Sequence, residues 1–202
     1  MSFWENTRKP EGLGGKLMVS LMNLGHSPVA RWGLRFLNVA SDAKVLDCGC
    51  GGGANIKRLL KKCPQGIVKG IDYSPVSVEK SQRVNADAIA KGRCTILQGS
   101  VAKRIFAESW FDAVTAFETV YFWPELPRCF REIHRMLKPG GMFLICNESN
   151  GDTDKDKKWT KIIDGMTIYK DVELKADLEQ AGFRDVQIHK NKWGWLCVTA
   201  RK

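Results

Sequence analysis

Apolar residues from position 44 onward alternate between short β-rich runs and longer segments with helical spacing. The β-rich runs predict strands at 44–48, 67–72, 94–98, 111–117 and 141–147. The apolar positions between them share a spacing of three or four: Ile56, Leu59, Leu60 and Cys63 in one segment, and Leu126, Phe130, Ile133 and Leu137 in another. Strands that alternate with helices in this way are typical of a parallel sheet covered by helices.

The last 32 residues depart from this alternation. A helix expected at 171–181 ends before Gly182, and strands are expected at 185–190 and 193–200. Only two residues lie between these strands, too few for a helical crossover, so the last strand must enter as an antiparallel hairpin. The pattern predicts the α/β class, with a doubly wound, mostly parallel seven-stranded sheet and a reversed last strand.

Two apolar stripes precede the first strand and predict N-terminal helices. Leu17, Leu21 and Leu24 mark the first, and Ser27-Pro28 begins a second whose inner face carries Val29, Trp32 and Phe36. We expect residues 1–40 to form a helical cap belonging to the same domain as a core at 41–202.

A charge-dense stretch, 152–161, is expected to be a mobile surface connection. Trp159, Ile162, Ile163 and Met166 recur at helical spacing and predict a short helix near the fifth strand.

Bulk composition favours one reduced, soluble domain. The chain has 202 residues, with 44% hydrophobic residues and a net charge of +10 that is spread along the sequence. We therefore expect solvated helix faces rather than a nucleic-acid surface. The apolar runs are too short to span a membrane and the first residues lack a signal-peptide pattern, so we expect a cytoplasmic protein without membrane association. The seven cysteines favour reduced core thiols, and no metal site is expected.

The most informative segment is VLDCGCGGGAN (45–55), in which an apolar strand runs into glycines and then into an amphipathic helix. Glycines permit a tight turn and let a ligand approach the backbone. Asp72 ends the next strand, where a carboxylate suits the hydroxyls of a ribose. The glycine spacing also fits a dinucleotide fingerprint. However, we expect Asp47 to lie within the turn, where it would repel a pyrophosphate and attract an amino group.

These residues resemble those of a known enzyme family. DCGCGGG is similar to the D/E-x-G-x-G-x-G first motif of the class I S-adenosylmethionine (SAM)-dependent methyltransferases, in particular the small methyltransferase type 11-like members, and residues 41–202 follow the family in register. FDAVTAFETV (111–120) resembles the fourth-strand motif, and LKPGG (137–141) the entry to the fifth strand. The resemblance implies a Rossmann-like fold, SAM as cofactor and methyl transfer as the activity.

The same resemblance implies a set of cofactor-binding residues: Asp47, Gly49, Gly51, Gly53, Asp72, Tyr73, Ser100, Val101 and Phe117. Ser100 is a departure, because many family members have an aspartate there against the adenine amine. Serine accepts a hydrogen bond without the charge. Adenine recognition is therefore expected to depend more on backbone groups near Val101.

Polar and aromatic residues at the strand ends are the candidates for acceptor chemistry. Tyr121 and Trp123 follow the fourth strand, Glu148 follows the fifth, and His26 lies between the two N-terminal helices. We predict catalytic roles for Tyr121 and Glu148. We predict substrate contact for Tyr121, Trp123, His26 and Trp4. Packing of the aromatic residues, solvation of Glu148 and a capping role for His26 are the alternatives.

The expected acceptor is a small molecule, because a wall formed by the N-terminal segment would leave little room for folded RNA or protein. Two other functions remain open. An RNA methyltransferase would use the same cofactor site, although the chain has no N-P-P-Y-type motif and its basic residues are scattered. A non-catalytic SAM-binding partner protein is the other. The sequence gives no indication of the oligomeric state.

Overall fold

The computed structural model describes residues 25–202, apart from the side chains of residues 154, 155 and 157. The first expected helix, with Leu17, Leu21 and Leu24, lies outside the described residues, and so does the predicted substrate residue Trp4. Of the expected N-terminal cap, residues 25–40 are described. They include helix α2 (Ser27–Gly33), which begins where the Ser-Pro pair predicted it.

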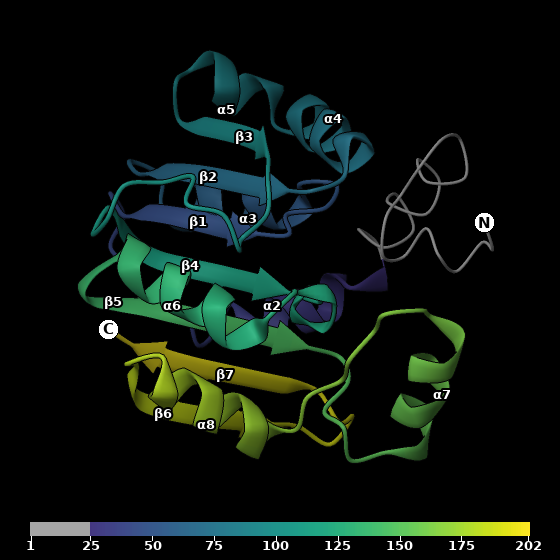
Figure 1. Cartoon of the computed structure of the whole chain (residues 1–202). Coiled ribbons are helices and arrows are strands. Elements are labelled where there is room, and N and C mark those ends of the chain that lie inside the picture. The colour runs from purple at the N-terminus through teal and green to yellow at the C-terminus, as the bar shows by residue number, and fades with distance from the viewer. Residues whose placement is uncertain (1–24) are drawn as a thin grey trace.

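Within residues 25–202 one seven-stranded sheet forms the centre of the molecule (Figure 1). Its strands are β1 (Lys44–Cys48), β2 (Ile67–Asp72), β3 (Cys94–Gln98), β4 (Phe111–Phe117), β5 (Leu137–Asn147), β6 (Arg184–Lys190) and β7 (Leu196–Arg201). The order is β3-β2-β1-β4-β5-β7-β6. β1 to β5 pair in parallel, whereas β7 runs antiparallel to both β5 and β6. The predicted α/β sheet with its reversed last strand is confirmed.

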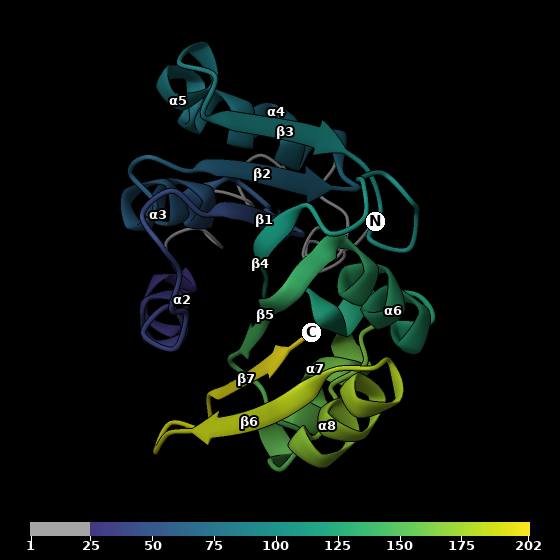
Figure 2. The same ribbon diagram turned by 90° about the vertical axis from the view of Figure 1, so that its left-hand side faces the viewer.

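Helices cover both faces of this sheet (Figure 2). The remaining elements are α3 (Ala54–Lys62), α4 (Pro75–Val84), α5 (Ala86–Ala90), the 3₁₀ helix η2 (Val120–Phe122), α6 (Leu126–Met136), α7 (Asp154–Ile162) and α8 (Asp171–Gln180). α2 and α3 lie on one face, and α6 and α8 lie on the other.

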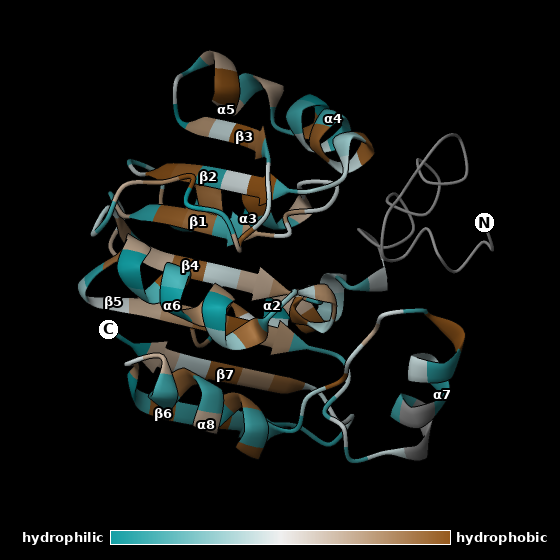
Figure 3. Cartoon of the chain, viewed as in Figure 1, coloured by the Kyte–Doolittle hydropathy of each residue, from teal (hydrophilic) through white to brown (hydrophobic). Residues whose placement is uncertain are grey.

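The amphipathic pattern explains these positions. The strands are largely hydrophobic and the helices carry polar residues on their outer faces (Figure 3). In α6 the stripe of Leu126, Phe130 and Ile133 is buried against the sheet, as predicted. At the start of α4, the Ser74 side chain accepts a hydrogen bond from the Ser77 N–H, and Pro75 occupies the first helical position.

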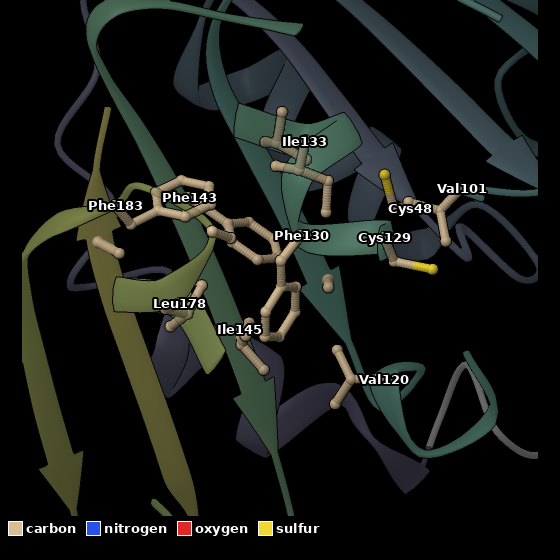
Figure 4. Close-up of a cluster of buried hydrophobic side chains, with 14 of the residues drawn as sticks. Cys48, Val101, Val120, Cys129, Phe130, Ile133, Phe143, Ile145, Leu178 and Phe183 are labelled. Carbon is tan, nitrogen blue, oxygen red and sulfur yellow. The ribbon is translucent and has the colours of Figure 1, made fainter. Parts of the chain in front are cut away.

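Each face of the sheet has its own hydrophobic core. On the α6 and α8 face, aromatic rings form the centre of the packing (Figure 4). Phe130 and Phe143 lie with ring centroids 5.7 Å apart, and Phe143 lies at the same distance from Phe183. On the other face, α2 approaches β5 so closely at Gly33 that a Cβ atom there would overlap the side chain of Cys146.

Two strands begin more than one residue away from their predicted first positions. β5 begins at Leu137 rather than at 141, because Leu137 pairs with Phe111 before a register shift. β7 begins at Leu196 rather than at 193, because the residues before it form the turn. There Gly194 has φ +83°, and the Asn191 side-chain oxygen accepts hydrogen bonds from the N–H groups of Trp193 and Trp195. The connection is therefore longer than two residues, and the hairpin is antiparallel as expected.

The charged stretch 152–161 also differs from the prediction, because it contains α7. Thr153 caps this helix by accepting a hydrogen bond from the Asp156 N–H. The side chain of Ile163, which follows α7, is buried. A short helix is therefore present where Trp159 and Ile162 predicted one, but it occupies the charged stretch and ends at Ile162, so Ile163 and Met166 follow it.

The edge strand β6 contains a register shift between Arg184 and Gln187, where Asp185 has φ +50°. This irregularity is a β-bulge.

All seven cysteines are free and buried, as expected for core thiols.

Among residues 25–202, none of the helices has both the length and the apolar character that crossing a membrane requires.

Replacement of Phe130 tests the aromatic core. Phe130→Ala is expected to lower the free energy of unfolding by about 3–5 kcal/mol, because it leaves a cavity between α6 and β5. Val172→Ala, at a position that is 64% exposed, is expected to change it by less than about 0.5 kcal/mol. Denaturant unfolding followed by circular dichroism measures both. Equal losses in the free energy of unfolding for the two variants would contradict the packing described for Phe130.

Candidate functional site

The carboxyl ends of β1, β2, β4 and β5 meet at one edge of the sheet, and the glycine turn lies there. The N–H groups of Gly49 and Cys50 both donate to the carbonyl oxygen of Ile71, at 2.8 and 3.0 Å. These bonds hold the turn against the end of β2. They bring a glycine-rich backbone and the following acidic residue, Asp72, to the same crevice, as the spacing predicted.

The three predicted glycines have different surroundings. A Cβ atom on Gly49, at φ +72°, would overlap the side chain of Thr119, which follows β4. A Cβ atom on Gly53, at φ +81°, would overlap Ser81 in α4. Gly51, at φ +52°, has no atom of residues 25–202 outside its own chain neighbours within 4 Å of the position a Cβ would take. Gly49 and Gly53 thus pack the turn against the protein, whereas Gly51 faces open space that a ligand can enter.

Asp72 is the acidic residue beside this open backbone. Asp72 is 7% exposed, and its carboxylate oxygens accept hydrogen bonds from the N–H groups of Gly51 and Ser74, both at 2.9 Å. Burial raises the pKa of Asp72, and the two N–H groups oppose that rise. Each carboxylate oxygen keeps a second lone pair for a ligand hydroxyl. The neighbouring Tyr73 is 39% exposed and offers an aromatic surface.

We expected Asp47 to lie within the turn, although the predicted strand 44–48 also includes it. In the structure Asp47 lies inside strand β1. Strand pairing with Gly70 and Thr115 continues through this residue. Its side chain is 1% exposed and accepts a hydrogen bond of 2.7 Å from the Thr115 hydroxyl. Burial raises the pKa of Asp47 to about 7, and the charge of Asp72 adds to the rise. A cation bound nearby would favour the ionised form.

The other predicted cofactor residues lie at the ends of β3 and β4. The Gly99 N–H donates to the Asp72 carbonyl oxygen at 2.9 Å, which places the turn after β3 beside β2. The Ser100 hydroxyl in that turn accepts a bond from the Ala102 N–H, and Val101 is buried. Phe117 is buried at the end of β4 and lies close to Gly33 of α2.

The two aromatic candidates after β4 are well packed. Tyr121 is 3% exposed, and its hydroxyl lies 3.1 Å from the N–H and 3.4 Å from the carbonyl oxygen of Ser149. The indole N–H of Trp123 donates to the Thr119 hydroxyl at 3.2 Å, and its ring packs on Phe143. These contacts position the segment after β4. Direct roles of Tyr121 in catalysis and of Trp123 in substrate binding stay predictions.

His26 and Glu148, predicted separately, are brought together with a third residue that the sequence analysis missed. The third is Glu118, which follows β4, and the possible ligand atoms of the three side chains lie within 4.8 Å of one another. Burial and the charge of Glu148 raise the pKa of Glu118 to about 8. Burial lowers the pKa of His26, and Glu148 opposes that effect. The position of Glu118 at the end of a central strand was the one available signal.

Comparison with known proteins gives methyltransferases among the relatives. A family model described as a methyltransferase domain matches residues 46–145. Cycloartenol-C-24-methyltransferase of Arabidopsis thaliana is 30% identical over 159 residues, covering 73% of this chain and 46% of that protein. An uncharacterized methyltransferase of Bacillus subtilis (strain 168), YdaC, is 25% identical over 188 residues, covering 90% of this chain and 96% of that protein.

Solved structures share the fold. A SAM-dependent methyltransferase from Aquifex aeolicus superimposes with a TM-score of 0.76 at 18% identity, covering 92% of this chain and 97% of that one. The chain spans less than half the length of the plant sterol methyltransferases that it matches.

The buried Asp47 predicts a specific pH dependence. Because its folded pKa, about 7, lies above the ordinary value of 3.8, the folded state holds a proton that the unfolded state releases. The free energy of unfolding should therefore fall as pH rises from about 4 to 7, by at most about 1.4 kcal/mol per unit. Asp47→Asn removes this loss and should be more stable than the parent chain at pH 8.

Chemical denaturation of both chains without added ligand, across pH 4 to 8, measures the difference. Asp112→Asn is the control with the opposite sign. Burial acts to raise the pKa of Asp112, but the hydrogen bonds and charges of Lys138 and Lys44 together lower it. A parent chain as stable as Asp47→Asn at pH 8 would show that the protein itself compensates the Asp47 charge.

Proposed function

Because the chain belongs to the class I SAM-dependent methyltransferases, we propose that it transfers a methyl group from SAM to a small-molecule acceptor. The observation that carries this proposal is the juxtaposition of Asp72 with the open backbone at Gly51. A carboxylate beside a side-chain-free turn suits a ribose that must lie close to the main chain.

The residues at this edge fit SAM, the cofactor of the family. Asp72 retains acceptor capacity for two ribose hydroxyls, and Tyr73 and the Ser100–Val101 turn are available to the adenine. Asp47 and the glycine turn would hold the methionine part, whose ammonium is positively charged. A pyrophosphate would instead meet the acidic Asp47 and Asp72. The negative charge of these two carboxylates therefore favours SAM, which carries positive charge, over a dinucleotide.

SAM supplies a methyl group already activated by the sulfonium, so the protein has mainly to align the acceptor and exclude water. The residues proposed for this task are His26 and Glu148. They lie close together where the start of α2 meets the ends of β4 and β5. His26 can orient an acceptor atom held within hydrogen-bond reach, and a carboxylate oxygen of Glu148 can accept its proton. Tyr121 would act on the same site by positioning the Ser149 backbone next to Glu148.

The small size of the acceptor is supported by two observations. The relatives include enzymes named for sterol and cycloartenol methylation, which are small-molecule acceptors. In addition, α2 packs over β5 and brings His26 beside Glu118 and Glu148 at the ends of β4 and β5. The proposed N-terminal wall that includes Trp4 remains a hypothesis on residues outside the described range.

Replacement of Asp72 tests the cofactor site. Asp72→Ala is expected to weaken SAM binding by roughly 1–3 kcal/mol, because the ribose hydroxyls lose a charged acceptor. Asp72→Asn, which keeps one carbonyl oxygen for the local N–H groups, guards against misfolding. Asp112 lies near the amino end of β4, away from the carboxyl ends of the strands, so Asp112→Asn should bind SAM like the parent chain. Calorimetric titration with SAM and with NAD measures the effect. Tighter binding of NAD than of SAM would overturn the assignment.

Turnover distinguishes the proposed activity from the two alternatives. The chain, supplied with methyl-labelled SAM, is expected to label a component of fractionated small metabolites and to leave RNA unlabelled. Label in RNA, with RNA affinity that falls steeply as salt rises, would identify an RNA methyltransferase. SAM binding without label in any fraction would favour a non-catalytic SAM-binding protein.

A further inference from the structure

Three side chains with metal-binding chemistry converge at the carboxyl ends of β4 and β5. His26 occupies the N-cap position just before α2, Glu118 follows β4, and Glu148 follows β5. One imidazole nitrogen and one oxygen from each carboxylate lie within 4.8 Å of one another, and all three side chains are partly buried. They come from separate elements, so the fold rather than local sequence creates the group.

The backbone fixes the two carboxylates against each other. β4 and β5 are parallel neighbours, with Phe117 paired to Cys146, so the residues after them leave the sheet side by side. The Glu118 N–H donates to the Cys146 carbonyl oxygen at 3.0 Å, and the Glu148 N–H donates to the Glu118 carboxylate. Glu118 has φ +56°, a left-handed conformation that is unusual for a glutamate. These bonds hold it there.

Helix α2 delivers the imidazole to the same point. The Cys146 thiol donates to the Val29 carbonyl oxygen at 3.5 Å, which sets the first turn of α2 over β5. Arg58 of α3 donates to the Ser27 hydroxyl at 2.6 Å and to the Asn55 side-chain oxygen at 2.7 Å. The start of α2 is thereby tied both to the sheet and to α3. His26 makes no side-chain capping bond, so its ring is not needed to begin the helix.

Two carboxyl groups at this separation repel each other when both are ionised, and partial burial strengthens the repulsion. A cation between them offsets that cost. The neutral imidazole adds a nitrogen donor, and a set of one nitrogen and two carboxylate oxygens suits divalent first-row transition metals better than Mg²⁺ or Ca²⁺, which prefer oxygen alone.

We infer that His26, Glu118 and Glu148 bind one divalent transition-metal ion of the Zn²⁺ or Mn²⁺ class. Three protein ligands leave coordination positions open, as in catalytic rather than structural metal sites. We assign these open positions to an oxygen atom of the methyl acceptor, and this assignment rests on the proposed function. The site departs from the sequence-based expectation, which included no metal. The three ligands are distant in sequence, so no local motif indicated them.

Metal titration of the full chain tests this inference without any acceptor. The chain is freed of metal with a chelator, kept reduced, and titrated by calorimetry with Zn²⁺ and with Mn²⁺. Co²⁺, whose visible absorption reports its ligands, serves as the spectroscopic probe. We expect one ion per chain and a Co²⁺ spectrum of nitrogen and oxygen ligands. Thiolate charge-transfer bands would show that the ion is held by cysteine and would overturn the site.

Variants locate the ion. His26→Ala and Glu148→Gln are each expected to weaken binding tenfold or more, since even the loss of outer-shell partners costs about 10–100-fold. The matched controls are His134→Ala, on the α6 face, and Glu125→Gln, on the surface, which should bind the metal like the parent chain. Circular dichroism and SAM binding of His26→Ala and Glu148→Gln should stay unchanged, which excludes misfolding as the cause.

The outcomes separate the inference from the proposed function. Absence of metal binding by the parent chain, or equal binding by all variants, overturns the metal site even if SAM binding and methyl transfer are found. Metal binding that depends on His26 and Glu148 upholds the site even if SAM binding fails, and in that case only the assignment of the acceptor to its open positions falls with the proposed function.

Discussion

The site depends on the parallel register of the central strands. Because β1, β2, β4 and β5 run in the same direction and are paired residue by residue, their carboxyl ends reach one edge of the sheet together. The two N–H groups bonded to the Ile71 carbonyl then fix the glycine turn at that edge. A slip of one residue in β1 would move Asp47 to the opposite face and detach the turn from Asp72.

The charge at this edge differs from that of the whole chain. Although the net charge is +10, the crevice gathers Asp47, Asp72, Glu118 and Glu148. In the two groups with the largest rise, Asp47 and Glu118, burial is the leading cause of a pKa near or above neutrality. Their ionised forms are therefore favoured when positive charge arrives. A sulfonium, an ammonium and a metal ion can each supply that positive charge.

Sequence reasoning predicted most of the fold, because strand and helix periodicity and the Ser-Pro and glycine signals are local. It placed Asp72 and Gly51 correctly beside each other for the same reason, since a strand end and a glycine turn can be recognised one at a time. Asp47 was misplaced because β1 is buried on both faces, and an acidic residue inside such a strand is indistinguishable from one that begins a turn.

Glu118 was missed for a different reason. Nothing in the sequence around it differs from the end of an ordinary strand, and its importance comes from Glu148 and His26, which only the pairing of β4 with β5 and the packing of α2 bring near. Likewise, the length of the last hairpin depends on the Asn191 side chain, which substitutes for backbone partners in the turn.

The bulge in β6 has a consequence for how the chain meets other molecules. An edge strand presents unpaired backbone groups on which a second chain can build a sheet, the first step of ordered aggregation. In β6 the left-handed Asp185 breaks the regular row of these groups, and the exposed charges of Arg184 and Lys190 flank the break. The other edge, β3, is regular and carries the exposed Thr95 and Leu97. Protection against strand addition is therefore unequal, and β3 is the edge on which intermolecular sheet growth meets the smaller barrier.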